Sequence, residues 1–262
     1  MENYILSTDS VNIHYTETGK GNTSIVFVHG WLGNINWWNN QETFLKEKYN
    51  IVKIDLGGHG KSGKTRQNWT GKQYADDIKT VINQINTSEI ILVGHSMSGA
   101  YVLEAFIDLP KVKAIVLVDT LKDLDQDFTP EQAEQFMFSN YRKDFKSAVE
   151  HILPQYLFVE ETPTIIKNQL QNEFIQNDSE LAINTLKPLY NMDIRKIAKL
   201  VDIPVRAINS NATPTNIESN QKYFKNYNYR TIEGTGHYPM LEKPDEFNII
   251  LKELIEELTA AK

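Results

Sequence analysis

A lone serine between an apolar strand and a helix-forming stretch is the feature that most constrains this fold. Residues 94–99 read Gly-His-Ser-Met-Ser-Gly and follow the apolar run Ile90–Val93. A serine at the apex of a tight strand-to-helix turn needs small neighbours two positions away, because strand and helix approach closely there. Gly94 meets this requirement, and Ser98 stands where a glycine is usual. The pattern predicts a nucleophile elbow at Ser96, against the alternative of a serine in an ordinary strand–helix loop.

Two more segments carry groups that a serine nucleophile requires. A strand-like run, Tyr229–Ile232, leads into a glycine-flanked loop that holds His237. A histidine in such a loop can reach the serine and act as its general base. Near the N-terminus, the buried-strand run Ile25–Val28 ends in His-Gly-Trp. The backbone N–H groups of Trp31 and Met97 are therefore candidates for an oxyanion hole.

The order of these segments, oxyanion loop first, then serine, then histidine, resembles that of the α/β-hydrolase superfamily. The chain is similar to the His-Gly-X branch, whose members are mostly esterases and related hydrolases. A serine at the elbow separates it from the dehalogenase and epoxide-hydrolase branches, which use aspartate there. The matching segments are His29-Gly30-Trp31, Asp55 to Ser62, the 94–99 elbow, Ile115 to Asp119, and Gly236-His237 with Pro244.

The hydrophobic pattern predicts an α/β fold with a mostly parallel central sheet and helices on both faces. An antiparallel hairpin is expected over residues 4–16, after which strands and helices alternate. The alternation then stops for a long helical stretch before the sheet resumes. We therefore expect a hydrolase core over residues 1–120 and 195–262, with a helical cap over 121–194 inserted after the sixth strand. The expected later strands are 24–28, 51–55, 89–93, 112–118, 205–209 and one near Tyr229, and the expected core helices lie near 39–48, 74–85, after Ser96, near 217–225 and from Pro244.

The expected cap, residues 121–194, contains helix start signals and many aromatic residues. Thr129-Pro130-Glu131-Gln132 offers an N-cap, a proline at the first helical position and a capping-box glutamine. Thr162-Pro163 repeats the signal, and Asp178 or Ser179 opens another helix, so we expect about four short helices. Several aromatic residues and one methionine are candidates for lining an apolar pocket or for ordinary core positions: Trp31, Trp37, Trp38, Phe136, Met137, Phe138 and Tyr141.

The catalytic acid is where this chain departs from the family it resembles. The resemblance expects a carboxylate in the loop after the strand at 205–209, but Ser210–Thr215 contains none. Thr213 stands where family members often have aspartate before proline, and Asn211 is the nearest isostere of aspartate. Asp119, at the end of the preceding strand, occupies a position from which some relatives supply the acid. We favour Asp119 over the other candidates, Asp123 included.

A second motif in the chain suggests a different function. Residues 58–65 fit the P-loop pattern G-x-x-x-x-G-K-[ST] and follow a strand. A P-loop binds phosphate because a helix begins at its Gly-Lys-Thr. Here residues 66–71 show no apolar periodicity, and the helix is expected to start around Thr70 or later. The resemblance also accounts for Asp55 to Ser62 without a nucleotide, so a P-loop NTPase is a remote alternative.

Composition excludes several classes of function. The 262 residues carry a formal charge of −7 and have a pI of about 5.4. This balance argues against nucleic-acid or anionic-membrane partners, because both need a basic face. The chain has no cysteine, which excludes disulfides, thiolate metal sites and a cysteine nucleophile. No stretch approaches a membrane span and the first residues lack signal-peptide features, so a cytoplasmic location is expected.

The prediction is a serine hydrolase that cleaves a small or medium carboxylic ester or thioester through an acyl-enzyme. The implied roles are Ser96 as nucleophile, His237 as base and Asp119 as the acid that orients it. No cofactor is expected, and no grouping of His, Asp and Glu has metal-ligand spacing. The resemblance gives His29 and His95 structural roles in loops, and His59 is expected to stabilise the glycine-rich loop in which it lies. The alternative is a non-catalytic or degenerate α/β-hydrolase-fold binding protein, in which the missing loop carboxylate marks lost turnover.

Overall fold

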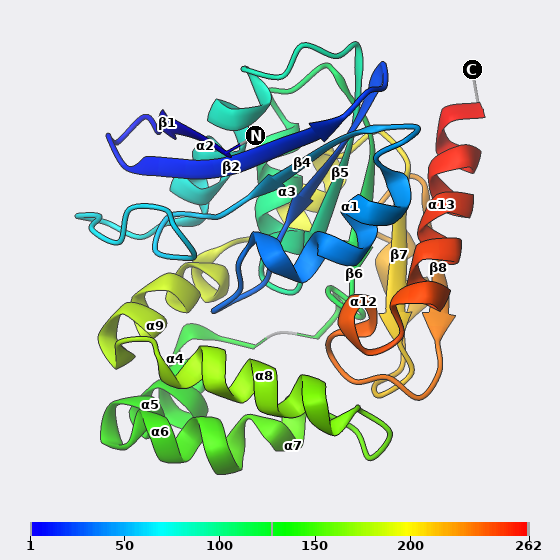
Figure 1. The fold of residues 1–262 in the computed structure, drawn as a ribbon. Coiled ribbons are helices and arrows are strands. Elements are labelled where there is room, and N and C mark those ends of the chain that lie inside the picture. Colours follow the sequence, from blue (N-terminus) through cyan, green and yellow to red (C-terminus); the bar gives the residue numbers. More distant parts are fainter. Residues whose placement is uncertain (1, 127, 261–262) are drawn as a thin grey trace.

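The computed structural model describes residues 2–126 and 128–260, and its centre is one eight-stranded sheet (Figure 1). The strands are β1 Glu2–Leu6, β2 Asn12–Gly19, β3 Thr23–Val28, β4 Asn50–Ile54, β5 Glu89–His95, β6 Val112–Val118, β7 Val205–Ser210 and β8 Tyr227–Ile232. They lie in the order β1-β2-β4-β3-β5-β6-β7-β8. The pairs β1–β2 and β2–β4 are antiparallel, and the other neighbouring pairs are parallel. The mostly parallel sheet predicted from the sequence is confirmed.

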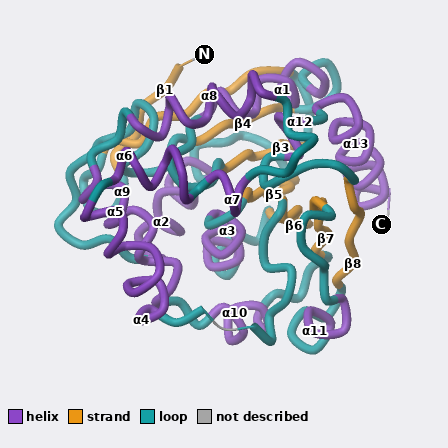
Figure 2. The backbone as a smooth tube through the Cα atoms, turned by 90° about the horizontal axis from the view of Figure 1, so that it is seen from below, coloured by secondary structure: helices purple, strands orange, loops and turns teal. Residues whose placement is uncertain are grey.

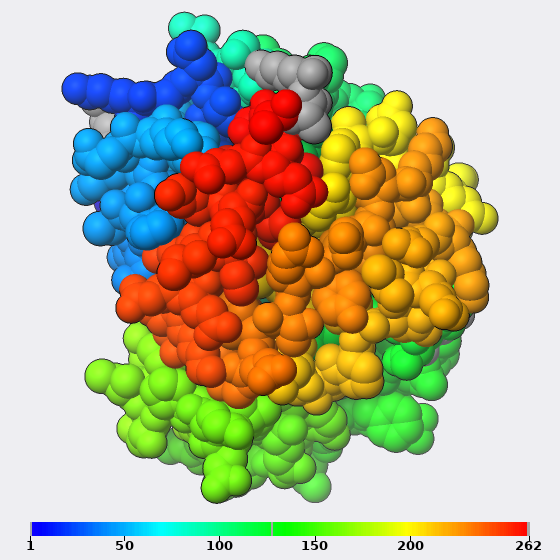
Figure 3. Space-filling model, turned by 90° about the vertical axis from the view of Figure 1, so that its right-hand side faces the viewer, coloured from blue at the N-terminus to red at the C-terminus, as the bar shows by residue number. Residues whose placement is uncertain are grey.

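Helices cover both faces of this sheet. The core has a 3₁₀ turn, Ile35–Trp38, and its α-helices are α1 Asn39–Leu45, α2 Gly71–Ile82, α3 Ser98–Phe106, α10 Ile194–Leu200, α11 Ile217–Gln221, α12 Pro239–Glu242 and α13 Pro244–Ala260. Helix α10 begins at the last residue of the 121–194 segment. All of β4 and nearly all of β3 and β5 are buried, which requires cover on both sides of the sheet. Helices α1 and α13 contact each other, as do α2 and α3, and Figure 2 shows these two groups on opposite faces. Figure 3 shows α13, in red, lying across the outer surface, with the green 121–194 segment below it.

The 121–194 segment leaves the sheet between two neighbouring strands. β6 pairs with β7 through Ile115 and Val205, although the insertion separates them in sequence. The described residues of the insertion form helices and turns and no strand, and Figure 1 shows them gathered at one end of the sheet. The helical elements are α4 Pro130–Ala133, a π-helical turn Glu134–Phe138, α5 Ser139–Lys143, α6 Phe145–Ser147, a π-helical turn Ala148–Ile152, α7 Pro154–Leu157, α8 Thr164–Ile175, α9 Ser179–Leu186 and a 3₁₀ turn Lys187–Asn191.

Two helices of this insertion begin where the sequence signals place them, whereas a third, expected to have Pro163 as its first residue, begins one residue later because the backbone of Pro163 is extended, with ψ 131°. Thr129 caps α4 in a capping box, Asp178 caps α9, and α8 begins directly after Pro163. In the core, the helix expected near 217–225 ends earlier, at Gln221, because hydrogen bonds between residues three apart tighten the chain into the turn before β8. Among the described residues, no helix is long and apolar enough to cross a membrane.

The P-loop-like segment 58–65 does not lead directly into a helix. Helix α2 begins only at Gly71, as expected from the sequence. The segment instead folds against the Asp55 carboxylate, which accepts the N–H of Lys61 at 2.9 Å and the N–H of Ile35 at 2.8 Å. Phosphate binding at a P-loop depends on the N-terminus of a helix that begins within the motif. The nucleotide-binding alternative therefore lacks its essential structural element.

Candidate active site

Ser96 lies in a strained turn between β5 and α3. Its φ is +55°, a left-handed conformation that costs a non-glycine residue roughly 1–2 kcal/mol. The Ser96 N–H donates to the carbonyl of Val118 at 3.0 Å, which holds the turn. A Cβ on Gly94 would lie 2.7 Å from the carbonyl oxygen of Ser98. Strand and helix therefore cross as closely as the predicted elbow requires.

The serine at 98, where the family pattern has glycine, makes a contact of its own. Its buried hydroxyl donates to the carbonyl oxygen of His29. Because His29 begins the candidate oxyanion loop, this hydrogen bond ties the elbow to that loop. The departure from the pattern thus links two parts of the site, while the small side chain still lets strand and helix meet.

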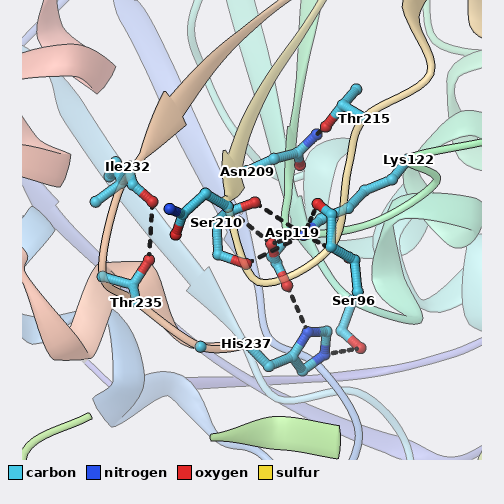
Figure 4. Close-up of polar contacts among 12 residues, drawn as sticks. Ser96, Asp119, Lys122, Asn209, Ser210, Thr215, Ile232, Thr235 and His237 are labelled. Atoms are coloured by element: carbon cyan, nitrogen blue, oxygen red, sulfur yellow. Dashed lines mark hydrogen bonds and ion pairs between the residues drawn. The ribbon is translucent and has the colours of Figure 1, made fainter. Parts of the chain in front are cut away.

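A chain of hydrogen bonds joins Ser96, His237 and Asp119 (Figure 4). The Nε2 atom of His237 lies 2.8 Å from Ser96 Oγ, and its Nδ1 atom lies 2.7 Å from Asp119 Oδ2. With Nδ1–H donating to the carboxylate, Nε2 is left to accept the serine proton. The structure brings the three predicted residues together from the ends of β5 and β6 and the loop after β8. This arrangement is the one that general-base activation of a serine requires.

The Asp119 carboxylate is buried and surrounded by donors. Its Oδ1 accepts the N–H of Ser210 at 2.7 Å and lies 2.7 Å from the Nζ of Lys122. Burial by itself raises the pKa of Asp119, but the hydrogen bond and charge of His237, together with the Lys122 ammonium, hold that pKa well below its usual range. Asp119 is therefore ionised at neutral pH and able to orient His237.

The other candidate acids lie away from His237. Asp123 accepts a hydrogen bond from the side-chain amide of Asn216 at 3.1 Å. The side-chain oxygen of Asn211 accepts the N–H of Gly234 at 3.0 Å. Neither side chain hydrogen-bonds to the imidazole within the described residues. The geometry therefore favours Asp119 over both, as the sequence does, and its catalytic role stays a prediction.

Glu242 holds the loop that carries His237. Its buried carboxylate accepts the N–H groups of Gly236 at 2.8 Å and Tyr238 at 3.0 Å, on either side of the histidine. It also accepts the hydroxyl of Thr162, in the 121–194 segment, at 2.6 Å. Sequence reasoning missed this residue, because no motif marks a carboxylate whose main partners are backbone amides.

The predicted oxyanion loop runs directly beside the elbow. A Cβ on Gly30 would lie 2.9 Å from the Cβ of Ser96, so only glycine allows this approach. In the part of the chain that the structure describes, the N–H groups of Trp31 and Met97 have no backbone acceptor. The indole N–H of Trp31 donates to the carbonyl of Ala182 at 2.8 Å, which fixes the loop to α9. Both backbone N–H groups thus remain the predicted oxyanion donors.

Two buried histidines support the site as neutral side chains. His29 donates from Nδ1 to the Gly30 carbonyl at 2.7 Å and accepts the Leu56 N–H at Nε2. His95 donates from Nε2 to the carbonyl of His237 at 2.8 Å. Burial and the neighbouring His237 lower the pKa of His95 to about 3, and burial also lowers the pKa of His29.

Among the described residues, no group of three or more His, Asp or Glu side chains is placed to hold a metal ion.

A cavity of about 580 Å³ opens onto Ser96 and His237 between the core and the 121–194 segment. Four of the proposed pocket residues, Trp31, Phe136, Met137 and Tyr141, line it. The ring of Trp31 stacks on that of Tyr141, with centroids 5.5 Å apart. The remaining lining residues are His95, Phe128, Ile152, Leu153, Tyr156, Leu157, Leu186, Leu189, Tyr190 and Tyr238.

Three aromatic residues proposed for this pocket pack in the core instead: Trp37, Trp38 and Phe138 are fully buried and lie outside the cavity lining. Trp37 donates its indole N–H to Glu173 of α8 at 2.8 Å, and Trp38 packs between β3 and α13. Phe138 packs against Tyr190, one layer behind the cavity wall. Aromatic composition alone does not distinguish the side of a helix that faces a cavity from the side that faces the core.

A sheet of this strand order with a serine elbow after β5 is the architecture of the α/β-hydrolase class. A family model described as "alpha/beta hydrolase fold" matches residues 23–160, and the chain belongs to this family. The chain is 27% identical over 254 residues to the pimeloyl-[acyl-carrier protein] methyl ester esterase of Wigglesworthia glossinidia brevipalpis, covering 91% of this chain and 95% of that protein.

Solved structures agree on the fold. The esterase EaEST from Exiguobacterium antarcticum has a TM-score of 0.86 at 20% identity, covering 98% of this chain and 100% of that chain. A bromoperoxidase from Bacillus anthracis has a TM-score of 0.83 at 17% identity, covering 97% and 100%. At 20% and 17% identity, these structures establish the shared fold and do not define the chemistry of the site.

Proposed function

We propose that this protein is a serine hydrolase that cleaves carboxylic esters through an acyl-enzyme. The observation that carries the proposal is the continuous hydrogen-bond chain from Ser96 through His237 to Asp119. The α/β-hydrolase family membership supports it, and so does the methyl ester esterase among the relatives.

The proposed reaction has two matching halves. His237 Nε2 takes the proton of Ser96 while the serine Oγ forms a bond to the acyl carbon. Negative charge moves onto the acyl oxygen, where the N–H groups of Trp31 and Met97 stabilise it. The bond to the alcohol oxygen then breaks, and the alcohol leaves with the proton from His237. Water repeats these steps on the acyl-enzyme, which releases the acid and restores the serine, and Asp119 stabilises the protonated histidine throughout.

The cavity favours an uncharged acyl group of small or medium size. Among the residues that the structure describes, no Asp, Glu, Lys or Arg lines the cavity. A charged group on the substrate would lose its hydration there without gaining a partner, which is strongly unfavourable. Apolar walls instead favour each buried methylene by about 0.8 kcal/mol. Thioesters of the same acyl groups fit the same chemistry.

The test combines a serine-reactive phosphonate probe with p-nitrophenyl esters of increasing acyl length. We expect the probe to label wild-type protein on the peptide that contains Ser96, and the esters to be hydrolysed. The hexanoate ester should exceed the adipate half-ester, which ends in a carboxylate, by at least about tenfold in kcat/KM, because the described lining residues include no Lys or Arg to pair with that carboxylate. Protein that neither takes the probe nor hydrolyses any ester would support the binding-protein alternative instead.

We also propose that residues 121–194 act as a cap that sets acyl preference over a core of residues 1–120 and 195–262. Phe136 lines the cavity and is 56% exposed, whereas Phe138 is fully buried behind it. Phe136→Ala should therefore shift the preferred acyl length with little change in melting temperature. Phe138→Ala should lower the free energy of unfolding by about 3–5 kcal/mol and leave the preference of the folded enzyme unchanged. Ester-series kinetics and thermal unfolding measure both effects, and an unchanged preference in Phe136→Ala would contradict the proposal at this position.

A further inference from the structure

Lys122 places a positive charge directly against Asp119, the proposed catalytic acid. Lys122 itself takes no part in the proposed reaction steps. Its Nζ lies 2.7 Å from Asp119 Oδ1, and its side chain is only 12% exposed. The same Nζ donates to the carbonyl oxygen of Ser210 at 3.0 Å and lies 3.1 Å from the hydroxyl oxygens of Ser210 and Thr213. Figure 4 shows Lys122, Ser210 and Asp119 meeting at one point. An ammonium has three donors, and these oxygens supply acceptors for all of them.

The partners of Lys122 lie in the loop where the family usually keeps its acid. Thr213 stands at the position where the resemblance expects aspartate, and Ser210–Thr215 contains no charged side chain. In this chain the carboxylate, Asp119, lies at the end of β6, and oxygen atoms of Ser210 and Thr213 bind the ammonium of Lys122 instead. The ion pair of Asp119 and Lys122 therefore joins the ends of β6 and β7.

We propose that Lys122 is a positioning residue that fixes Asp119 against the β7 loop and limits how strongly Asp119 retains a proton on His237. The inference rests on the proposed function. A carboxylate stabilises the protonated imidazole beside it, and a cation on the other oxygen of that carboxylate opposes this stabilisation. Removing the Lys122 charge would therefore let Asp119 stabilise the protonated form of His237 more strongly.

The other titratable groups around His237 do not supply this effect. The His95 ring lies 4.9 Å from the His237 ring, and its pKa of about 3 leaves it neutral. Tyr238 contacts the imidazole from the same loop, and burial raises its pKa well above the usual value. Glu242 faces the flanking amides, and Asp123 faces Asn216. The described residues that line the cavity include no Asp, Glu, Lys or Arg.

The experiment compares wild type with Lys122→Met and Lys122→Arg. The pKa of His237 is followed by NMR of its ring protons, and the pH profile of kcat/KM is measured on a neutral p-nitrophenyl ester, with active sites counted by phosphonate titration. Lys122→Met should raise the pKa in both measurements by roughly 0.5 to 1 pH unit and lower plateau kcat about tenfold. Lys122→Arg should restore the wild-type pKa, because the charge returns. If Lys122→Met does not fold, Lys122→Gln keeps donors without charge and gives the same comparison.

A merely structural lysine would lower the number of active sites without moving either pKa, and that result would overturn the proposal. A downward movement of the His237 pKa in the neutral variant would also overturn it. Failure of the proposed function looks different, because wild-type protein would then show no labelling and no turnover. The NMR titration needs no turnover, so it still decides whether Lys122 controls the imidazole.

Discussion

Ser96→Ala is expected to abolish phosphonate labelling and to lower kcat for ester hydrolysis by about 10⁴-fold or more. The substitution removes the oxygen that forms the acyl-enzyme in the proposed mechanism, while the oxyanion N–H groups and the cavity remain. These remaining groups would leave a small residual rate above that in water. Steady-state kinetics at high enzyme concentration and mass spectrometry of the labelled peptide measure the two losses. Wild-type turnover in Ser96→Ala would refute the serine mechanism.

Ser98 offers a matched control for that substitution, since it is a serine two positions along the same turn. Ser98→Ala leaves the buried carbonyl of His29 without its side-chain donor, which should lower the free energy of unfolding by about 1–3 kcal/mol. Labelling at Ser96 should persist, with turnover reduced by less than about tenfold. If both variants lose labelling, the turn itself is damaged. The loss in Ser96→Ala would then not show that Ser96 is the nucleophile.

Local chemistry explains which features could be predicted from the sequence. The elbow at Ser96 depends on small neighbours within a few residues, and the capping box at Thr129 depends on a side chain three positions away. The strands of the sheet centre could be predicted because burial on both faces demands continuous apolar runs. In each case the residues that determine the structure are close together in the chain.

Contacts between distant segments explain what the sequence did not predict. Glu242 and Thr162 are 80 positions apart, and Lys122 and Ser210 are 88 apart, so no local pattern connects them. Trp38 and Phe136 are both aromatic residues near the site, but the first is buried in the core and the second lines the cavity. Only the packing of helices against the sheet decides between these positions.

Asp119→Asn is expected to lower kcat by about 10³-fold or more. An amide can still accept one hydrogen bond but carries no charge, so it cannot stabilise the protonated His237 that forms in the transition state. It can also turn its NH₂ toward the imidazole and favour the wrong tautomer. The change should leave KM nearly unaltered, because Asp119 does not line the substrate cavity. Steady-state kinetics on a neutral ester separate kcat from KM, and Asp123→Asn, the same change on the same loop, should stay within about twofold of wild type.

Asn211→Asp tests the competing assignment by returning a carboxylate to the loop where the family usually keeps one. The side chain of Asn211 accepts the Gly234 N–H and does not reach the imidazole, so the added charge should give little gain in wild-type protein. In the Asp119→Asn background it should likewise fail to restore turnover, because no hydrogen bond to His237 forms from that position. A nearly silent Asp119→Asn combined with a sharp gain from Asn211→Asp would reverse the assignment. The native chain would then be an impaired hydrolase whose acid position holds asparagine.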